Sequence, residues 1–180
     1  MSTHDKSLKN EPVGAEVASF ALSPQFDCVY EEGMRLVEAA AAYLDGAGRR
    51  QARKLHTSVS SAYATQSMRM TTRLLEVASW LLVQRALKSG EISAEDAERR
   101  RRKVQLRPSD RPSHIKHFDE LPEQLRALIS ASVAISDRIM RIDQAISAGS
   151  NARASASVNP VEAQRSVIRT AFTVIEGGRR

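Results

Sequence analysis

Three stretches of the chain repeat apolar residues at alternating spacings of four and three, which is the period of a helix with one apolar side. They extend over residues 23–45, 49–88 and 120–148. No stretch stands out with the strict alternation of apolar and polar residues that is typical of a half-buried strand. The pattern therefore predicts an all-α fold, an antiparallel three-helix bundle with one long central helix.

The expected helix ends carry residues that favour them. Ser23 followed by Pro24 supplies an N-cap and a first-turn proline to the first helix. Residues 49–88 contain no proline or glycine, so they are predicted to form a single helix that ends before Gly90. Gly149 is expected to end the third helix, because glycine is the usual stop signal.

The second and third helices differ in how their apolar residues are distributed. The last turns of the run Tyr63–Lys88 are apolar on nearly every side, and such a helix must be covered on every side. A homodimer is therefore predicted, with Trp80, Val83 and Leu87 at the interface. The alternative is that Trp80 fills the core of its own chain, because tryptophan is favoured in both settings. The third helix has one regular stripe, made of Leu121, Leu125, Leu128, Ser132, Ile135, Ile139, Ile142 and Ile146.

The ends of the chain lack the helical pattern of the middle. Residues 1–22 are polar and small, so they are predicted to be a disordered arm, with the helical bundle over 23–148. Residues 149–180 begin with a small, polar sequence that is typical of a flexible tail. A short amphipathic helix is predicted within this tail, at 160–176, and it could dock a partner. Its candidate contact residues are Ile168 and Phe172.

Composition supports a soluble helical protein of the reducing cytoplasm. The 180 residues are 42% hydrophobic and only 4% aromatic, which fits one packed helical core. Cys28 is the only cysteine, so no internal disulfide can form, and it is expected to be a small packing residue. The N-terminus does not resemble an export signal. The run Val77–Val83 is far shorter than the roughly 20 residues that span a bilayer, so membrane insertion is not expected.

The chain has a net charge of +6, and part of this charge lies in one cluster of basic residues, Arg99 to Lys103. Ser93 and Asp96 resemble a capping box that starts a short helix, and this helix runs into the cluster. The cluster is predicted to contact an acidic partner, and the alternatives are a solvated helix end or a nucleic-acid contact. Because no recognition motif accompanies it, nucleic acid is not the expected partner. The candidate contact residues are Arg99, Arg100, Arg101 and Arg102.

Motifs that would supply catalytic chemistry are missing. The sequence has no Glu-x-x-His, no His-Glu-x-x-His, no phosphate-binding glycine loop and no dinucleotide fingerprint. His114 and His117, followed by Asp119 and Glu120, could share a metal if they were locally helical, but two ordinary loop histidines are the simpler interpretation. The sequence therefore predicts no catalytic residues, no bound metal and no cofactor, which favours an interaction protein over an enzyme.

Three blocks of sequence resemble the alphaproteobacterial RcdA family, the regulator of CtrA degradation. The blocks are FDCVYEEGMRLVEAAAAYLDGAGR, AYATQSMRMTTRLLEVASWLLVQRAL and SHIKHFDELPEQLRALISASVAISDRI. The resemblance extends from about Ser23 to Ile146, and the central block is the most specific. It implies a dimeric three-helix bundle without enzymatic activity.

The resemblance also implies a role and partners. Members of this family act as adaptors for the ClpXP protease, and they join the response regulator CpdR and the cyclic-di-GMP-binding protein PopA in delivering CtrA for degradation at a cell pole. The family has no catalytic motif to transfer to this sequence. From the residues alone, the competing function is a basic helical protein associated with nucleic acid.

Overall fold

The structure is a computed structural model that describes residues 19–108 and 117–158, with side chains described through residue 149. No strand occurs within these two ranges, so the predicted all-α fold is confirmed. The elements are α2 (Pro24–Asp45), α3 (Ala47–Ala52), α4 (Thr57–Lys88), α5 (Ala94–Arg101), the 3-10 turn η2 (Phe118–Glu120) and α6 (Glu123–Val158).

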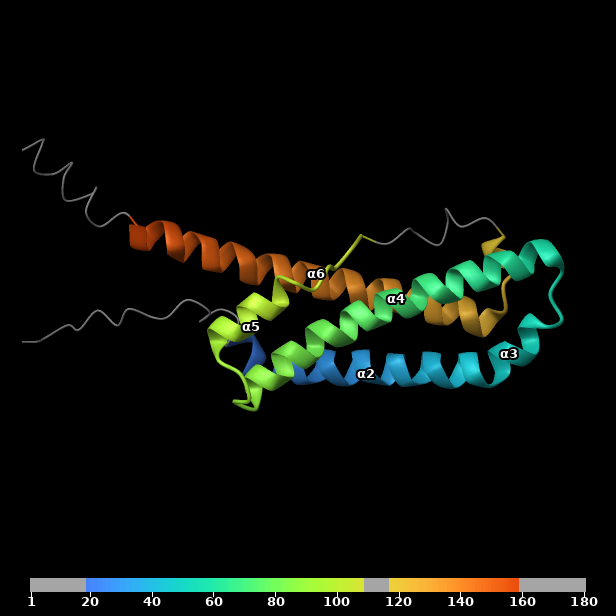
Figure 1. Cartoon of the computed structure of the whole chain (residues 1–180), viewed down its shortest axis with the longest axis horizontal. Coiled ribbons are helices and arrows are strands. Elements are labelled where there is room, and N and C mark those ends of the chain that lie inside the picture. Colours follow the sequence, from blue (N-terminus) through green and yellow to red (C-terminus); the bar gives the residue numbers. More distant parts are fainter. Residues whose placement is uncertain (1–18, 109–116, 159–180) are drawn as a thin grey trace, which may run out of the picture.

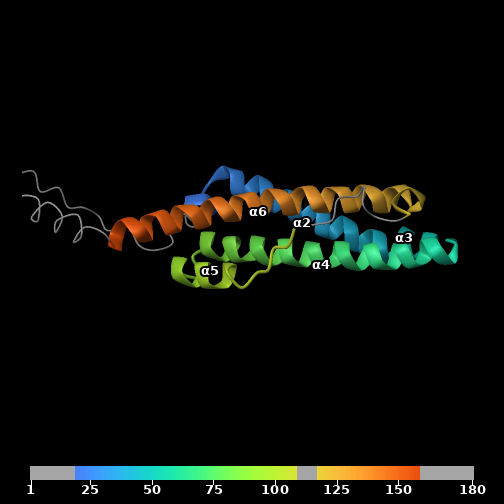
Figure 2. The same ribbon diagram turned by 90° about the horizontal axis from the view of Figure 1, so that it is seen from above.

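The three long helices α2, α4 and α6 lie along one another in an elongated bundle (Figures 1 and 2). In Figure 1 the sequence colours run in the same direction along α4 and α6 and in the opposite direction along α2. Two contacts agree with this, because Arg73 meets Ser132 and Trp80, further along α4, meets Asp143, further along α6. The predicted antiparallel relation therefore holds for α2 against each of the others, whereas α4 and α6 are parallel.

The parallel pair results from the long connection between α4 and α6. This connection contains α5, which packs at the end of α4, and then residues 102–108, which run back along the bundle (Figure 2). Parallel neighbours need such a crossover, whereas antiparallel helices can be joined by a short loop. We call the two ends of the bundle the α5 end and the α3 end.

The expected single helix over 49–88 is interrupted. The chain reverses direction at residues 53–56, where Lys54 and Leu55 make only turn-type hydrogen bonds to Gln51 and Ala52. The short helix α3 instead stays against α2, and the Tyr43 hydroxyl donates a hydrogen bond to Gln51 Oε1 at 2.9 Å. No proline or glycine marks the break, so tertiary packing decides where the chain turns.

Several predicted helix ends are confirmed. The Ser23 side chain caps α2 by accepting a hydrogen bond from the Phe26 amide, and Ser93 caps α5 by accepting from the Asp96 amide at 3.1 Å. Gly90 follows α4 with a φ of 75°, a left-handed conformation that glycine adopts without strain. Local capping chemistry was therefore a reliable guide to these ends.

The first described residues do not behave as a disordered arm. Residues 19–21 form a helical turn, and the Phe20 ring lies 5.9 Å from both the Phe26 and Trp80 rings. Phe20 therefore covers one side of the core, which a local sequence pattern could not reveal. Residues 1–18 lie outside the described part of the chain.

Helix α6 continues beyond its predicted end at Gly149, as far as Val158. One glycine costs a helix only about 1 kcal/mol relative to alanine, and the residues that follow it are rich in alanine. The predicted tail helix at 160–176, with Ile168 and Phe172, lies outside the described residues.

The core consists of two clusters along the bundle. At the α3 end, Tyr43, Tyr63 and Leu125 pack together, and at the α5 end, Phe26, Trp80 and Ile139 do so. Gly33 lets α2 approach α4 closely, since a Cβ atom at this position would be only 2.5 Å from a Leu81 methyl group. The regular stripe of the third helix is confirmed, since its fully buried members are Leu121, Leu125, Ser132, Ile135, Ile139 and Ile146.

Gln84 of α4 is the least expected residue of this core. Its side chain is fully buried, and neither its amide nitrogen nor its amide oxygen has a hydrogen-bond partner. Because an unpaired buried amide costs about 1–3 kcal/mol, we expect Gln84→Met to raise the free energy of unfolding by about 1–2 kcal/mol. Urea unfolding tests this, with the exposed Gln144→Met as the matched control. A lower stability for Gln84→Met would contradict it.

Candidate protein-binding surfaces

One side of α4 exposes large apolar residues to solvent. Met68 is 73% exposed, Leu75 is 62% exposed and Leu82 is 50% exposed. They are spaced by seven residues, which is close to two turns of a helix, so they form one stripe along α4. A stripe of this kind on an otherwise polar surface indicates a contact surface. We call Met68, Leu75 and Leu82 the α4 stripe.

The residues predicted at the dimer interface do not belong to the α4 stripe. Trp80 is fully buried in the core of its own chain, so it is not available to a second subunit. Val83 and Leu87 are partly buried and pack against the same core cluster. Of the two alternatives for Trp80, the structure therefore shows the intrachain one. The predicted surplus of apolar surface exists, but it belongs to the α4 stripe.

Arg101 joins α4, α5 and α6 through a buried network of ion pairs. Its guanidinium donates to the Glu98 carboxylate at 2.8 and 2.9 Å and to Asp143 Oδ1 at 2.5 Å. The same Asp143 oxygen accepts a hydrogen bond from Trp80 Nε1 at 2.7 Å. Arg101 is only 3% exposed, so its charge is used inside the protein. The network fixes α5 against the bundle.

The network holds its members in the charged form. Burial raises the pKa of the Glu98 carboxyl, but the hydrogen bonds from Arg101 and Arg102 outweigh burial, and the pKa falls below its ordinary value of 4.5. Burial lowers the pKa of the Arg101 guanidinium, but its bonds to Asp143 and Glu98 outweigh this and raise it. At neutral pH Glu98 and Arg101 therefore form an ion pair.

The lowered pKa of Glu98 predicts a specific dependence of stability on pH. A depressed carboxyl pKa contributes stability above the unfolded value of about 4.5, and this contribution is lost as the pH falls through the folded value. The stability difference between wild type and Glu98→Gln should therefore be largest near neutral pH and shrink below pH 4.5. Unfolding at several pH values measures it. The exposed Glu95→Gln is the control, and an equally large difference at acid pH for Glu98→Gln would contradict the account.

The basic cluster of α5 does not present four available cations. Arg99 pairs with Asp96, and Arg102 pairs with Glu98 at 2.7 Å. Arg101 is inside the network, so it cannot contact the acidic partner predicted from the sequence. Arg100 is exposed. The remaining surface, Arg99, Arg100 and Arg102, is a small and partly neutralised patch, which does not favour the nucleic-acid alternative.

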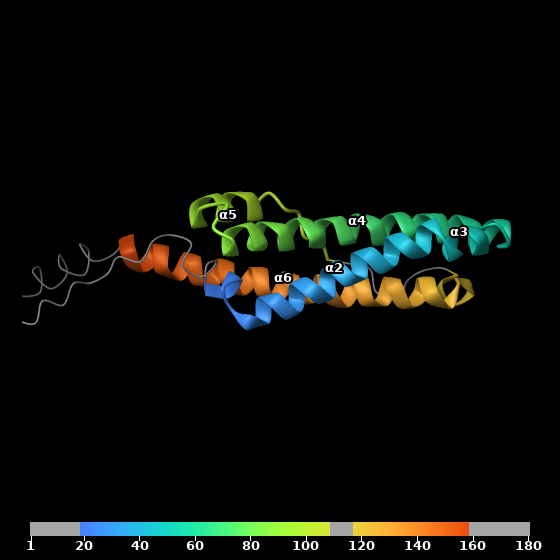
Figure 3. The ribbon, with the colours of Figure 1, turned by 90° about the horizontal axis from the view of Figure 1, so that it is seen from below.

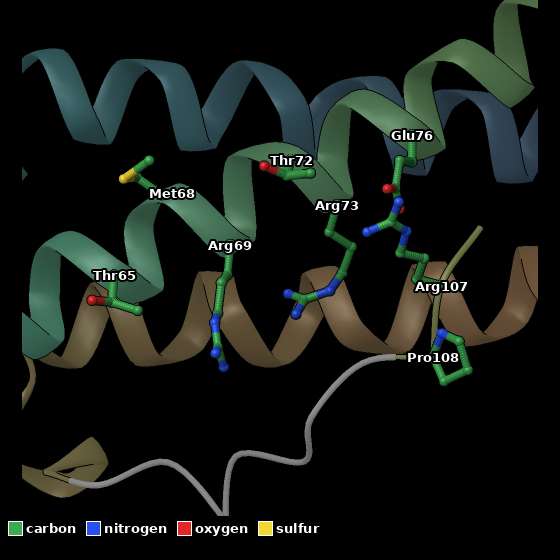
Figure 4. Close-up of a pocket in the computed structure, with 8 residues that line it drawn as sticks. All are labelled: Thr65, Met68, Arg69, Thr72, Arg73, Glu76, Arg107 and Pro108. Atoms are coloured by element: carbon green, nitrogen blue, oxygen red, sulfur yellow. The ribbon is translucent and has the colours of Figure 1, made fainter. Parts of the chain in front are cut away.

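A groove of about 580 Å³ runs beside α4, where residues 107–108 pass (Figure 4). Arg69 and Arg73 extend toward α6, and Arg73 donates a hydrogen bond to Ser132 Oγ at 2.7 Å. Among the described residues that line this groove, Glu76 is the only carboxylate. The lining residues are Thr65, Met68, Arg69, Thr72, Arg73, Glu76, Arg107 and Pro108.

The weaker candidates for chemistry are not brought together. His117 Nδ1 lies 2.7 Å from Glu120 Oε1, and His114 lies outside the described residues. Within the described ranges, no group of three or more metal-binding side chains exists. Cys28 is exposed, so its expected role as a packing residue is wrong. The described helices also include none that is long and apolar enough to cross a membrane.

These observations define the class of protein. The described part of the chain is a helical bundle that offers contact surfaces and no clustered catalytic groups. A family model described as "Protein of unknown function (DUF1465)" matches residues 17–172. The crystal structure of RcdA from Caulobacter crescentus CB15 matches with 42% sequence identity and a TM-score of 0.56, covering 69% of this chain and 92% of that chain. No curated protein matches.

The chain therefore belongs to the RcdA family, and the resemblance seen in its sequence is confirmed. The family is not one of known enzymes.

The α4 stripe could have been found in the sequence from the seven-residue spacing of Met68, Leu75 and Leu82. In a helix that is apolar on every side, however, the sequence alone does not show which side faces solvent. Burial of Arg101 had no local signal, because its partner Asp143 is 42 residues away.

Proposed function

We propose that this protein is a non-enzymatic adaptor that helps deliver cell-cycle regulators such as CtrA to the ClpXP protease. The observation that carries the proposal is the 42% identity to RcdA over 92% of that chain. The available chemistry is consistent with it, because the described residues present contact surfaces rather than a catalytic centre. An adaptor needs only such surfaces.

The adaptor acts as a homodimer, and the α4 stripe is the surface that the two subunits share. Three exposed apolar residues in a straight line are self-complementary about a two-fold axis, which is how most homodimers form. Val83 and Leu87, which are only partly buried, are proposed as further contacts of this dimer. A dimer carries each docking surface twice, which strengthens binding without new contacts.

The partners of the adaptor are the response regulator CpdR, PopA and the ClpXP machinery, assembled at a cell pole in the cytoplasm. Arg99, Arg100 and Arg102 offer one surface to an acidic partner, and the tail residues Ile168 and Phe172 offer another contact. The family relationship supports these partners, and the exposure of the three arginines supports the first contact.

Size-exclusion chromatography of the purified full-length protein tests the proposal. Mixed with CpdR, PopA and ClpX, the chain should co-elute with them in a complex that none of them forms alone. The matched sample omits CpdR, which should remove the chain from the fraction that contains ClpX. Separate elution of all the components at concentrations well above a micromolar Kd would contradict the proposed partners.

A further inference from the structure

A second group of basic residues lies at the α3 end of the bundle, opposite the end that carries α5 (Figure 3). Between Gly46 and Leu75 the sequence contains no aspartate or glutamate, although it contains six arginine and lysine residues. Four of these fall within six positions of α3 and the turn that follows it, and all four are exposed. We call them the α3 patch: Arg49, Arg50, Arg53 and Lys54.

The charges of the α3 patch are not compensated by the described protein around it. None of the four side chains forms an ion pair or hydrogen bond with another described residue. Lys88 and Arg138, by contrast, pair with Asp27 and Glu32. Asp45 lines one hollow together with Arg49 and Arg53, so among the described residues the α3 patch keeps a local excess of positive charge.

The contacts that hold α3 in place come from residues outside the patch. Only Arg49 and Arg50 lie within α3 itself, in its last turn, where positive charges suit the helix dipole, and Arg53 and Lys54 follow in the turn. The packing of α3 depends on other residues, such as the buried Gly48 and the hydrogen bond of Gln51. The outward-facing charges of the patch are therefore available to a partner.

The patch surrounds two hollows that could receive side chains. One, of about 540 Å³, places Arg49 and Arg53 beside the apolar Leu44 and Ala52, beside Tyr63 and Ser60, and beside one carboxylate, that of Asp45. The other, of about 420 Å³, is lined by Ala47, Arg50, Gln51, Arg53 and Lys54. Arginines around a partly apolar hollow suit a carboxylate neighboured by apolar side chains.

From these observations we propose that the α3 patch is a docking site for an acidic segment of a partner protein. A protein fits better than nucleic acid, because residues 49–54 span only about 8 Å along a helix and could follow few phosphates. Three of the four cations are arginine, which is enriched at protein interfaces, whereas lysine is depleted there. The adaptor role gives this site its biological meaning, but the binding test below does not depend on that role.

Fluorescence anisotropy with two labelled probes tests the proposal on the full-length protein. The first probe is a synthetic peptide of alternating glutamate and leucine, and the second is a short duplex DNA. Arg49→Glu with Arg53→Glu should weaken peptide binding by about tenfold or more, since both cations face one hollow. The control, Arg35→Glu with Arg141→Glu, makes the same change of charge at exposed sites of α2 and α6 and should change binding by less than about twofold.

The other outcomes would overturn the proposal. Equal losses in both double variants would mean that only net charge matters, and tighter patch-dependent binding of DNA would assign the site to nucleic acid. Arg50→Gln with Lys54→Gln repeats the test if the first variant does not fold. Loss of the proposed peptide binding would say nothing against CtrA delivery, which is measured with ClpXP. Absence of CtrA delivery would likewise say nothing against peptide binding by the α3 patch, so the two proposals can be rejected separately.

Discussion

Replacing Arg101 with methionine is expected to lower the free energy of unfolding by about 3–5 kcal/mol, the range seen when one partner of a buried ion pair is removed. Methionine keeps much of the volume but leaves the carboxylates of Glu98 and Asp143 without their shared cation. Asp143 accepts the hydrogen bond of Trp80 Nε1, and without Arg101 its carboxylate would no longer be held in place for this bond. We therefore expect α5 to detach from α4 and α6 before the rest of the bundle unfolds.

Trp80 is the only tryptophan, so its fluorescence during urea unfolding reports directly on this network. Arg100→Met is the matched control, because the neighbouring side chain is exposed and should change stability by less than about 0.5 kcal/mol. If Arg101→Met lost no more stability than this control, the network would not be what holds α5 in place.

Replacing Leu75 with glutamate is expected to convert the homodimer into a monomer. Leu75 is the middle residue of the α4 stripe, and in a symmetric interface the substitution would place two negative charges close together where water is excluded. We expect the dissociation constant to rise at least about 100-fold, which corresponds to about 2.8 kcal/mol. The fold should survive, because the side chain is already 62% exposed.

Analytical ultracentrifugation of the wild type and two variants measures this change. Leu22→Glu is the matched control, because Leu22 is also a large apolar residue, 66% exposed, but lies outside the α4 stripe. It should remain a dimer, whereas Leu75→Glu should sediment as a monomer. A wild-type protein that is monomeric at tens of micromolar would contradict the dimer itself, since a Kd above that range is too weak to matter in a cell.

Local chemistry was enough to predict much of the fold. The stripe from Leu121 to Ile146 identified the third helix, and Ser23 and Ser93 located two helix starts, because periodicity and capping act over a few residues. The direction of α6 was not accessible in the same way. It depends on the path of the connection that follows α5, of which residues 102–108 run back along the bundle, and no local sequence pattern predicts such a path.

The candidate surfaces were harder to predict for a related reason. The sequence does not distinguish the four consecutive arginines from Arg99 to Arg102. The structure does, because it buries Arg101 in an ion pair with Asp143 of α6 and leaves Arg100 exposed. Likewise Trp80 and Leu82 belong to one apolar run, and only the packed neighbours show which of them faces outward. Charge and hydropathy identify candidate residues, whereas tertiary contacts decide which of them remain available to a partner.

The rate at which purified ClpXP degrades CtrA in the presence of CpdR and PopA is the most direct measure of the adaptor role. We predict that adding this protein accelerates the loss of CtrA, that Leu75→Glu removes most of the acceleration, and that Leu22→Glu retains it. The same rate of CtrA loss with and without the protein, in a reaction where ClpXP degrades another substrate normally, would contradict the account.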